Sequence, residues 1–247
     1  MKILIVTVAG MATRFSESVG YDCLKCLYQS NTFPEALLPR LLRQASAVDR
    51  IIIVGGFRYS ELCEKVAEQL PHLMYKITLV ENKHYADFGS AYSLYLGLRA
   101  AMEYPFDHLI FAEGDLFLDG ESFERIVNAD TDVVTINSDP VVANKSVAFY
   151  YDTQEKLHYI YDTAHHALRI AEPFLGIYNS GQVWKFCRPE LLRSTVKMIS
   201  DQEWEGTNLI LVQKYFGNMK KRDYLLLPFR KWINCNTAED LLKILEE

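Results

Sequence analysis

Residues 3–28 read ILIVTVAGMATRFSESVGYDCLKCLY, and this stretch decides the fold. Its first six residues form an apolar run that is broken only by Thr7, which predicts a buried parallel strand. The side chains then shrink at Ala9-Gly10, where a ligand can approach the backbone closely.

Two spaced cations, Arg14 and Lys25, follow this turn. Backbone N–H groups in such a turn can bind phosphate oxygens, and Arg and Lys neutralise the charge that a turn alone leaves unbalanced. The stretch therefore predicts a polyphosphate site. The alternative is a plain strand and loop with two solvated cations.

Short apolar runs alternate with helical patterns over the first half of the chain. This alternation predicts βαβ units and an α/β fold with a mostly parallel sheet, in which ligands bind beyond the carboxyl ends of the strands. The predicted strands are 3–8, 51–54, 77–80 and 108–112, and the predicted helices are 34–47, 59–70 and 90–102.

The second half has a different pattern. Predicted strands at 133–136, 147–151 and 157–161 have no helix between them, so we expect antiparallel additions at one edge of the sheet. Helices are expected at 189–199, 207–216 and 237–245. No linker or repeat interrupts the sequence, and one domain spanning 1–247 is the simplest organisation.

The composition excludes several classes of protein. The chain has 247 residues, of which 49% are hydrophobic and 23% are charged, and its net charge of −6 argues against a nucleic-acid-binding protein. No apolar run is long enough for a membrane span, and residues 1–3 lead directly into a strand without a cleavage-type pattern, so we expect a cytoplasmic protein. Five scattered cysteines do not suggest a disulfide framework.

A second informative stretch is residues 111–116, FAEGDL. A strand ends, Gly114 permits a sharp turn, and Asp115 follows at the carboxyl edge of the sheet, facing the first loop. Mg²⁺ is usually bound by one or two carboxylates and phosphate oxygens, so Asp115 is the predicted metal ligand. The alternative is a helix cap or turn residue.

Five pieces of the sequence together resemble one known family, and they span nearly the whole chain in the family's order. They are 9–15 (AGMATRF), 24–27 (LKCL), 85–95 (YADFGSAYSLY), 113–115 (EGD) and 236–241 (NTAEDL). The chain resembles the sugar-1-phosphate nucleotidyltransferase superfamily, and within it the small bacterial phosphocholine cytidylyltransferase type. This resemblance implies a Rossmann-like, mostly parallel twisted sheet flanked by helices, with antiparallel additions in the C-terminal half.

The sequence departs from the family pattern at three positions. Ala12 replaces a usual glycine, Leu24 replaces a usual proline, and Asn236 stands where the family has a second metal-binding Asp. An amide oxygen can bind Mg²⁺ but carries no charge, so Asp115 and Asn236 are the predicted ligands and Glu113 is a further candidate. We expect an Asn236→Asp exchange to be tolerated.

The resemblance implies that an acceptor phosphate attacks the α-phosphate of a nucleoside triphosphate and releases pyrophosphate, with Mg²⁺ as cofactor. Arg14 would contact the leaving phosphates, Lys25 would bridge the α-phosphate and the acceptor phosphate, and Lys145 is a further catalytic candidate. Such a displacement needs alignment and charge neutralisation more than a nucleophilic side chain. An edge lysine without a ligand is the alternative for Lys145.

The remaining predicted site residues fall into two sets. Those expected to bind the nucleotide are Val8, Ala9, Gly10, Met11, Ala12, Thr13, Gly55, Asn82, Gly89 and Ser90. Aromatic and polar residues are expected to surround a cationic group of the acceptor by cation–π contact and charge; they are Tyr85, Tyr92, Glu172, Tyr178, Asn179 and Trp204. The pair His165-His166 is expected in a loop, because adjacent residues on a strand point to opposite faces.

The predicted function is transfer of CMP from CTP to a small phosphorylated acceptor, either phosphocholine-like or another amine- or amide-bearing phosphate. The resemblance also implies a role in capsule or cell-surface polysaccharide biosynthesis, and it is compatible with a homodimer. Two alternatives stay open. One is a sugar-1-phosphate nucleotidyltransferase that uses UTP or dTTP, or a molybdopterin nucleotidyltransferase. The other is a non-catalytic nucleotide-binding regulatory domain. The neutral Asn236 keeps this second alternative open.

Overall fold

The computed structural model describes residues 1–143, 145–161 and 168–245. Its strands make up a large mixed sheet and a small two-stranded one. They are β1 (Lys2–Val8), β2 (Arg50–Gly55), β3 (Ile77–Glu81), β4 (His108–Glu113), β5 (Leu116–Leu118), β6 (Val133–Asn137), β7 (Ala148–Asp152), β8 (Leu157–Tyr159), β9 (Phe174–Phe186), β10 (Leu225–Pro228) and β11 (Trp232–Asn234).

Helices connect these strands. The α-helices are α1 (Thr13–Val19), α2 (Leu37–Gln44), α3 (Tyr59–Gln69), α4 (Ser90–Ala101), α5 (Gly120–Asn128), α6 (Pro189–Lys197), α7 (Asp201–Trp204), α8 (Leu209–Phe216) and α9 (Ala238–Leu242). Short 3₁₀ helices are η1 (Lys25–Leu27), η2 (Pro71–Lys76) and η3 (Lys221–Asp223). No helix in these described ranges is long and apolar enough to cross a membrane.

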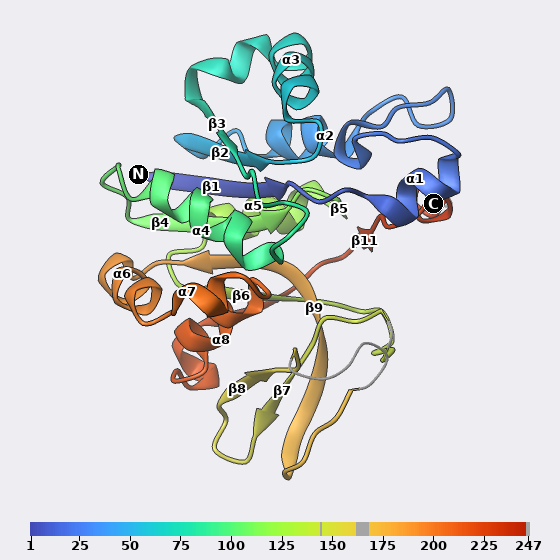
Figure 1. Cartoon of the computed structure of the whole chain (residues 1–247). Coiled ribbons are helices and arrows are strands. Elements are labelled where there is room, and N and C mark those ends of the chain that lie inside the picture. Colours follow the sequence, from blue (N-terminus) through green and yellow to red (C-terminus); the bar gives the residue numbers. More distant parts are fainter. Residues whose placement is uncertain (144, 162–167, 246–247) are drawn as a thin grey trace.

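The large sheet has the strand order β10-β6-β9-β4-β1-β2-β3, with the β7–β8 hairpin attached to β9. β1 pairs in parallel with both β2 and β4, and β2 pairs in parallel with β3. The expected α/β fold with a mostly parallel sheet is therefore confirmed. Figure 1 shows the sheet between its helices, with β7, β8 and the first half of β9 extending away from the main body.

The predicted antiparallel strands lie on one side of the parallel strands β3-β2-β1-β4, as expected, but the strand that joins them to β4 was not predicted. β9 lies inside the sheet, antiparallel to β4 on one side and to β6 on the other. Its buried half contains Lys185, which interrupts the apolar pattern and hides the strand in the sequence. The Lys185 amine donates to the carbonyl oxygens of Ile126 and Val127 at the end of α5 (3.1 and 2.9 Å), which explains how a lysine fits there.

Two hydrophobic layers cover the sheet and fix its register. Alternate residues of β1 point to opposite faces: Ile3 and Ile5 pack with α4, α6 and α8, whereas Leu4 and Val6 pack with α2, α3 and α5. The strands are thus buried on both faces, as the unbroken apolar run predicted. Their carboxyl ends meet at one side of the molecule, where the loops after β1, β3 and β4 gather.

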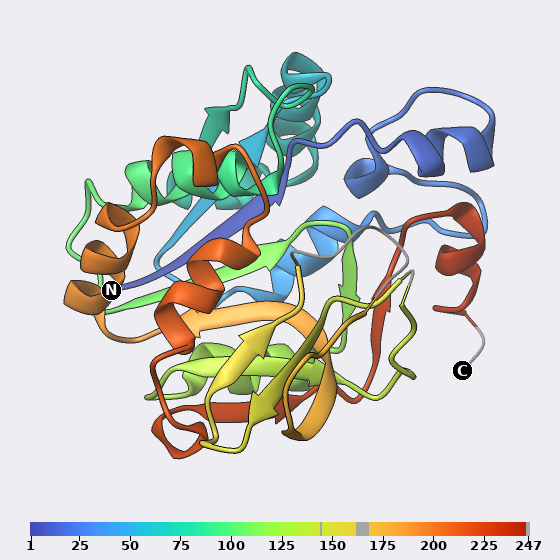
Figure 2. The same cartoon turned by 60° about the horizontal axis from the view of Figure 1, so that its bottom comes forward.

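The C-terminal segment returns to the first loop. β11 pairs antiparallel with β5, directly after β4, and α9 lies beside α1 in both views (Figures 1 and 2). The Ala238 N–H donates to Ser18 Oγ (2.9 Å), which joins α9 to α1. Residues from the two ends of the described chain are therefore brought together at the carboxyl edge of the sheet.

Candidate active site

A cavity of about 260 Å³ opens beyond the carboxyl ends of β1 and β4. It is close to the lower limit of about 300 Å³ for small-molecule sites. Its walls come from residues within four segments, 7–12, 24–26, 82–93 and 113–115. The predicted nucleotide-binding residues that line it are Val8, Ala9, Gly10, Ala12, Asn82, Gly89 and Ser90.

The loop after β1 offers backbone donors to this cavity. Ala12 precedes α1, and the first hydrogen bond of this helix runs from the Ser16 N–H to the Ala12 carbonyl (2.9 Å). Within the described chain, the N–H groups of residues 10–15 have no acceptor. Successive unpaired N–H groups are suited to phosphate oxygens, as the sequence predicted for this loop. Met11, in the same loop, and Thr13, the first residue of α1, do not line the cavity.

Ala12 occupies the left-handed region, with φ 52° and ψ 35°. An L-residue with a side chain is disfavoured there by about 1 to 2 kcal/mol, whereas glycine is not. Glycine, which is usual at this position in the nucleotidyltransferases that the sequence resembles, is therefore the residue that the backbone conformation favours.

Ala12→Gly is expected to raise the free energy of unfolding by about 0.5 to 1 kcal/mol, after allowance for the greater entropy of glycine in the unfolded chain. Chemical denaturation measures the change. The control is Ala129→Gly, because Ala129 has φ −62° and the exchange there should destabilise. Equal losses of stability in the two variants would show that the left-handed conformation is not strained.

Gly55 has a packing role that the sequence did not reveal. A Cβ there would lie 2.3 Å from Leu62 Cδ2 and 2.9 Å from Tyr59 Cδ2, so glycine lets α3 approach the end of β2. Gly55 does not line the cavity, and its predicted contact with the nucleotide is not supported by this position. The neighbouring Gly56 contacts the site segment instead, because a Cβ there would lie 2.5 Å from Tyr85 Cβ.

The segment before α4 is fixed by hydrogen bonds within the chain. Asn82 is buried, its Nδ2 donates to Ser93 Oγ (2.9 Å), and its Oδ1 accepts from the His84 N–H (2.8 Å). The Gly89 N–H donates to the Glu205 carbonyl (2.7 Å), and Ser90 Oγ accepts from the Asn208 N–H (3.0 Å). These hydrogen bonds fix the shape of the cavity wall. The Asn82 side chain and the Gly89 N–H both have their hydrogen-bond partners within the chain.

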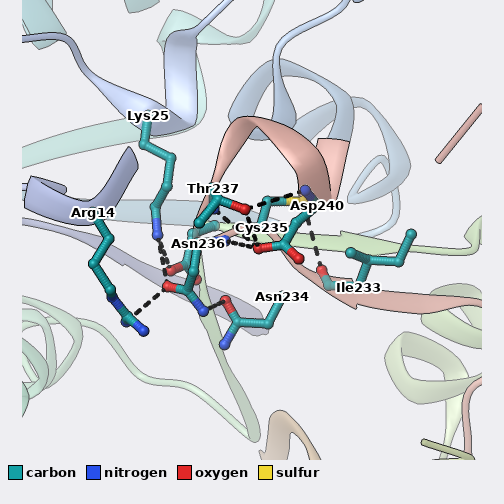
Figure 3. A network of polar contacts seen from close by, with 9 residues as sticks. Arg14, Lys25, Ile233, Asn234, Cys235, Asn236, Thr237 and Asp240 are labelled. Carbon is teal, nitrogen blue, oxygen red and sulfur yellow. Dashed lines mark hydrogen bonds and ion pairs between the residues drawn. The ribbon is translucent and has the colours of Figure 1, made fainter. Parts of the chain in front are cut away.

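Two of the three predicted catalytic residues, Arg14 and Lys25, meet the predicted metal ligands in one polar cluster. Lys25 Nζ lies 2.6 Å from Asp115 Oδ2 and donates to Asn236 Oδ1 at 3.4 Å. Arg14 Nη2 donates to the same amide oxygen at 3.1 Å. Figure 3 shows Arg14 and Lys25 extending toward Asn236 from separate segments. Residues far apart in the sequence thus converge in this cluster, of which Lys25 and Asp115 line the cavity and Arg14 and Asn236 do not.

The local backbone explains why Asp115 and Asn236 are neighbours. The Cys235 N–H donates to the Asp115 carbonyl (3.1 Å), next to the pairing of β5 with β11. The Asn236 N–H donates to Asp240 Oδ2 (3.0 Å), and Thr237 and Asp240 form a capping box at the start of α9. The side chains at 115 and 236 are therefore set by regular secondary structure on both sides.

Glu113 is a second carboxylate in the cavity wall. Its Oε1 accepts a hydrogen bond from Nδ2 of Asn208 (2.8 Å), the residue that precedes α8. This hydrogen bond fixes the orientation of the carboxylate. Burial, followed by the Asp115 carboxylate, raises the pKa of Glu113 from 4.5 to about 7, whereas Asn208 and Lys25 act in the opposite direction. A carboxyl group in this environment is destabilised when it ionises without a compensating cation.

Glu113→Gln is expected to stabilise the metal-free protein above pH 7 and to weaken Mg²⁺ binding. The folded state retains the proton to about pH 7, whereas the unfolded state releases it near 4.5. The free energy of unfolding of the wild type should therefore decrease between these pH values, and the variant should lack this part of the decrease. Unfolding in EDTA at pH 5, 7 and 8 measures it; identical pH slopes would contradict the assignment.

The donor set fits Mg²⁺. Asp115 Oδ1 is buried and has no hydrogen-bond partner in the structure, and the Glu113 carboxylate stands in the same wall. Over the described ranges, no group of three or more His, Cys, Asp or Glu residues could hold a metal ion. Asn236, also predicted as a ligand, directs its oxygen to two cations instead.

The predicted acceptor residues are divided between two places. Tyr85 lines the cavity, and Tyr92 packs on Phe88, another lining residue, with 5.1 Å between ring centroids. Trp204 is buried in the core with its ring 5.0 Å from that of Tyr95, so its predicted role at the acceptor is not supported. Its sequence context of acidic residues gave no sign of this burial.

The other predicted acceptor residues lie in or next to the extension formed by β7, β8 and the first half of β9. Tyr178 stacks on Phe149 at 5.5 Å, and Asn179 is buried, with its Nδ2 3.5 Å from the Asp139 carbonyl. Glu172 accepts from Tyr150 Oη at 2.7 Å.

Lys145 is exposed in the loop before β7 and does not line the cavity. His165 and His166, like Asn144 beside Lys145, lie outside the described residues.

Sequence reasoning missed Ser93 and Asn208. Ser93 follows Ser90 by one helical turn, so its spacing could have placed it in the wall. Asn208 comes from a distant helix, and only the fold brings it to Glu113.

The sequence model of the family described as "Domain of unknown function (DUF6564)" matches residues 21–247. The chain belongs to this family. The matched region contains Lys25, Asp115 and Asn236, whereas the loop with Arg14 precedes it. No curated protein matches the chain.

The fold of this DUF6564 chain is shared by solved structures that include the following two. The inositol-1-phosphate CTP transferase from T. maritima has a TM-score of 0.67 and 19% identity, over 100% of this chain and 94% of that one. The CTP:phosphocholine cytidylyltransferase LicC from Streptococcus pneumoniae has a TM-score of 0.65 and 20% identity, over 99% and 98% of the two chains. The nucleotidyltransferase fold expected from the resemblance is thereby confirmed.

Proposed function

We propose that this chain is a nucleotidyltransferase that transfers CMP from CTP to a small phosphorylated acceptor. One observation carries the proposal: Lys25 and Asp115 form an ion pair in the wall of a cavity that a loop of unpaired N–H groups also reaches, and Arg14 joins Lys25 at the Asn236 amide oxygen. Cations, a carboxylate with a free oxygen and unpaired backbone donors are the groups that a triphosphate and its metal need.

In the proposed reaction, an oxygen of the acceptor phosphate attacks the α-phosphorus of CTP. A new phosphorus–oxygen bond forms, the bond from the α-phosphorus to the bridging oxygen breaks, and its electron pair leaves with pyrophosphate. Lys25 neutralises the α-phosphate and the incoming phosphate, which otherwise repel each other. Arg14 and the N–H groups of residues 10–15 bind the leaving phosphates and stabilise the charge that develops there.

Asp115 and Glu113 would hold Mg²⁺. When bound, the ion supplies charge neutralisation on the phosphates. The Asp115 Oδ2 contact with Lys25 leaves Oδ1 for this purpose. The fold then has to hold Lys25 close enough to contact both the Asp115 carboxylate and the substrate phosphates.

The preference for CTP is supported by the two structures of similar fold, both of which are named for reactions with CTP. The proposed acceptor is an amine- or amide-bearing phosphate, and the aromatic rings of Tyr85, Phe88 and Tyr92 beside the cavity support it. Aromatic faces attract ammonium groups by cation–π contact.

The test is pyrophosphate release by the purified full chain with Mg²⁺. CTP, UTP, dTTP, ATP and GTP are each offered with phosphocholine, phosphoethanolamine and a panel of sugar 1-phosphates. We expect turnover with CTP and an amine-bearing phosphate, and none when the acceptor is left out.

Turnover with UTP or dTTP and a sugar 1-phosphate, but not with CTP, would replace the proposal with the sugar nucleotidyltransferase alternative. A protein that binds nucleotide without releasing pyrophosphate with any acceptor would instead favour a regulatory role.

A further inference from the structure

The Asn236 amide oxygen is the meeting point of the two site cations. It accepts from Arg14 Nη2 at 3.1 Å and from Lys25 Nζ at 3.4 Å. Arg14 comes from α1 and Lys25 from η1, and Figure 3 shows both extending to this one oxygen. An amide oxygen has two lone pairs, so these donors use its full capacity.

The orientation of the amide is fixed from its other side. Asn236 Nδ2 donates to Asn234 Oδ1 at 2.9 Å, and a reversed amide would point its N–H groups at two cations. The backbone of residue 236 is held by Asp240 Oδ2, which accepts from its N–H at 3.0 Å. The oxygen is thus presented to Arg14 and Lys25 by a rigid support rather than by a mobile side chain.

Charge decides what this oxygen can bind. Two cations within hydrogen-bond distance repel a divalent ion, and the neutral amide offers no charge in return. Asp115 differs, because one of its oxygens pairs with Lys25 and the other is buried without a partner. Asp115 and Glu113 are therefore the groups left for a metal ion, and Asn236 is occupied by the cations.

We propose that Asn236 is a positioning residue that holds Arg14 and Lys25 at a fixed separation without neutralising either. This inference rests on the proposed function. A carboxylate at the same place would form ion pairs with both cations and compete with the substrate phosphates for them. The expectation that Asn236→Asp is tolerated is accordingly reversed.

The experiment compares wild type, Asn236→Ala and Asn236→Asp by calorimetry with CTP in EDTA, which reports on the cations without metal. We expect Asn236→Asp to weaken CTP binding at least tenfold and Asn236→Ala to weaken it less. Electron paramagnetic resonance of Mn²⁺ at saturating CTP then measures metal affinity, which Asn236→Ala should leave within twofold of wild type. In kinetics with Mg²⁺, Asn236→Ala should lower kcat more than it raises KM.

Asp201→Asn, at an exposed helix start away from the cavity, controls for the exchange of a carboxylate and an amide, and thermal melting checks the fold of every variant. A tenfold loss of Mn²⁺ affinity in Asn236→Ala, or unchanged metal-free CTP binding in Asn236→Asp, would overturn the inference while the proposed function stands. A wild type that neither binds CTP nor releases pyrophosphate would overturn both.

Discussion

Lys25→Ala is expected to lower turnover by about 10²- to 10³-fold, the loss that follows removal of one preorganised charge-stabilising group. Lys25 Nζ lies 2.6 Å from Asp115 Oδ2, and only 13% of the side chain is exposed, so its charge acts where water screens little. Without it, the α-phosphate and the acceptor phosphate repel each other. Initial rates of pyrophosphate release measure the effect.

Lys25→Met is the second variant, because it keeps most of the aliphatic stem and so preserves packing when the charge is lost. Lys197→Ala, on the exposed end of α6, is the control and should retain wild-type turnover. Equal thermal stability of Lys25→Met and wild type would show that the rate change is not a folding defect. Turnover within twofold of wild type in both Lys25 variants would remove this residue from the mechanism.

Asp115→Asn is expected to abolish metal-dependent turnover while CTP binding in EDTA changes little. The exchange keeps an oxygen that can accept from Lys25 but removes the negative charge, leaving Glu113 as the nearest carboxylate of the proposed set. An uncharged oxygen binds Mg²⁺ weakly, so calorimetric Mg²⁺ affinity at saturating CTP should decrease strongly.

Asp201→Asn serves again as the control, because it removes one carboxylate at an exposed position outside the cavity. Should Asp115→Asn retain both the Mg²⁺ affinity and the rate of wild type, the metal site must lie elsewhere. A variant that binds Mg²⁺ normally but is inactive would instead assign Asp115 to orienting Lys25.

The parts of the site that the sequence predicted are those encoded locally. The apolar run of β1 and the glycine after Glu113 mark where strands end, and strand ends in a parallel sheet share one edge. Lys25 and Asp115 could therefore be placed at the same edge from their sequence positions, and the structure brings them within 2.6 Å.

The parts that escaped prediction depend on contacts between distant segments. Nothing near Trp204 in the sequence indicates that its ring packs on that of Tyr95. Gly55 has the sequence context of a ligand-contacting glycine, and only the structure shows that α3 packs against it. The role of Asn236 depends on which way its amide faces, and that direction is set by Arg14, Lys25 and Asn234 together.

The insertion of β9 beside β4 also has a consequence for how the chain folds. Leu109–Ala112 of β4 are fully buried, and their outer edge pairs with residues 183–186 of β9, far later in the chain. Until that later segment arrives, the β4–β1–β2–β3 unit presents an open apolar edge. Non-local pairing of this kind is slow to form, and an open edge can associate with other chains in the meantime. We therefore expect the yield of refolded protein to decrease as the protein concentration rises. Association through the unpaired edge of β4, rather than the stability of the native state, would limit this yield.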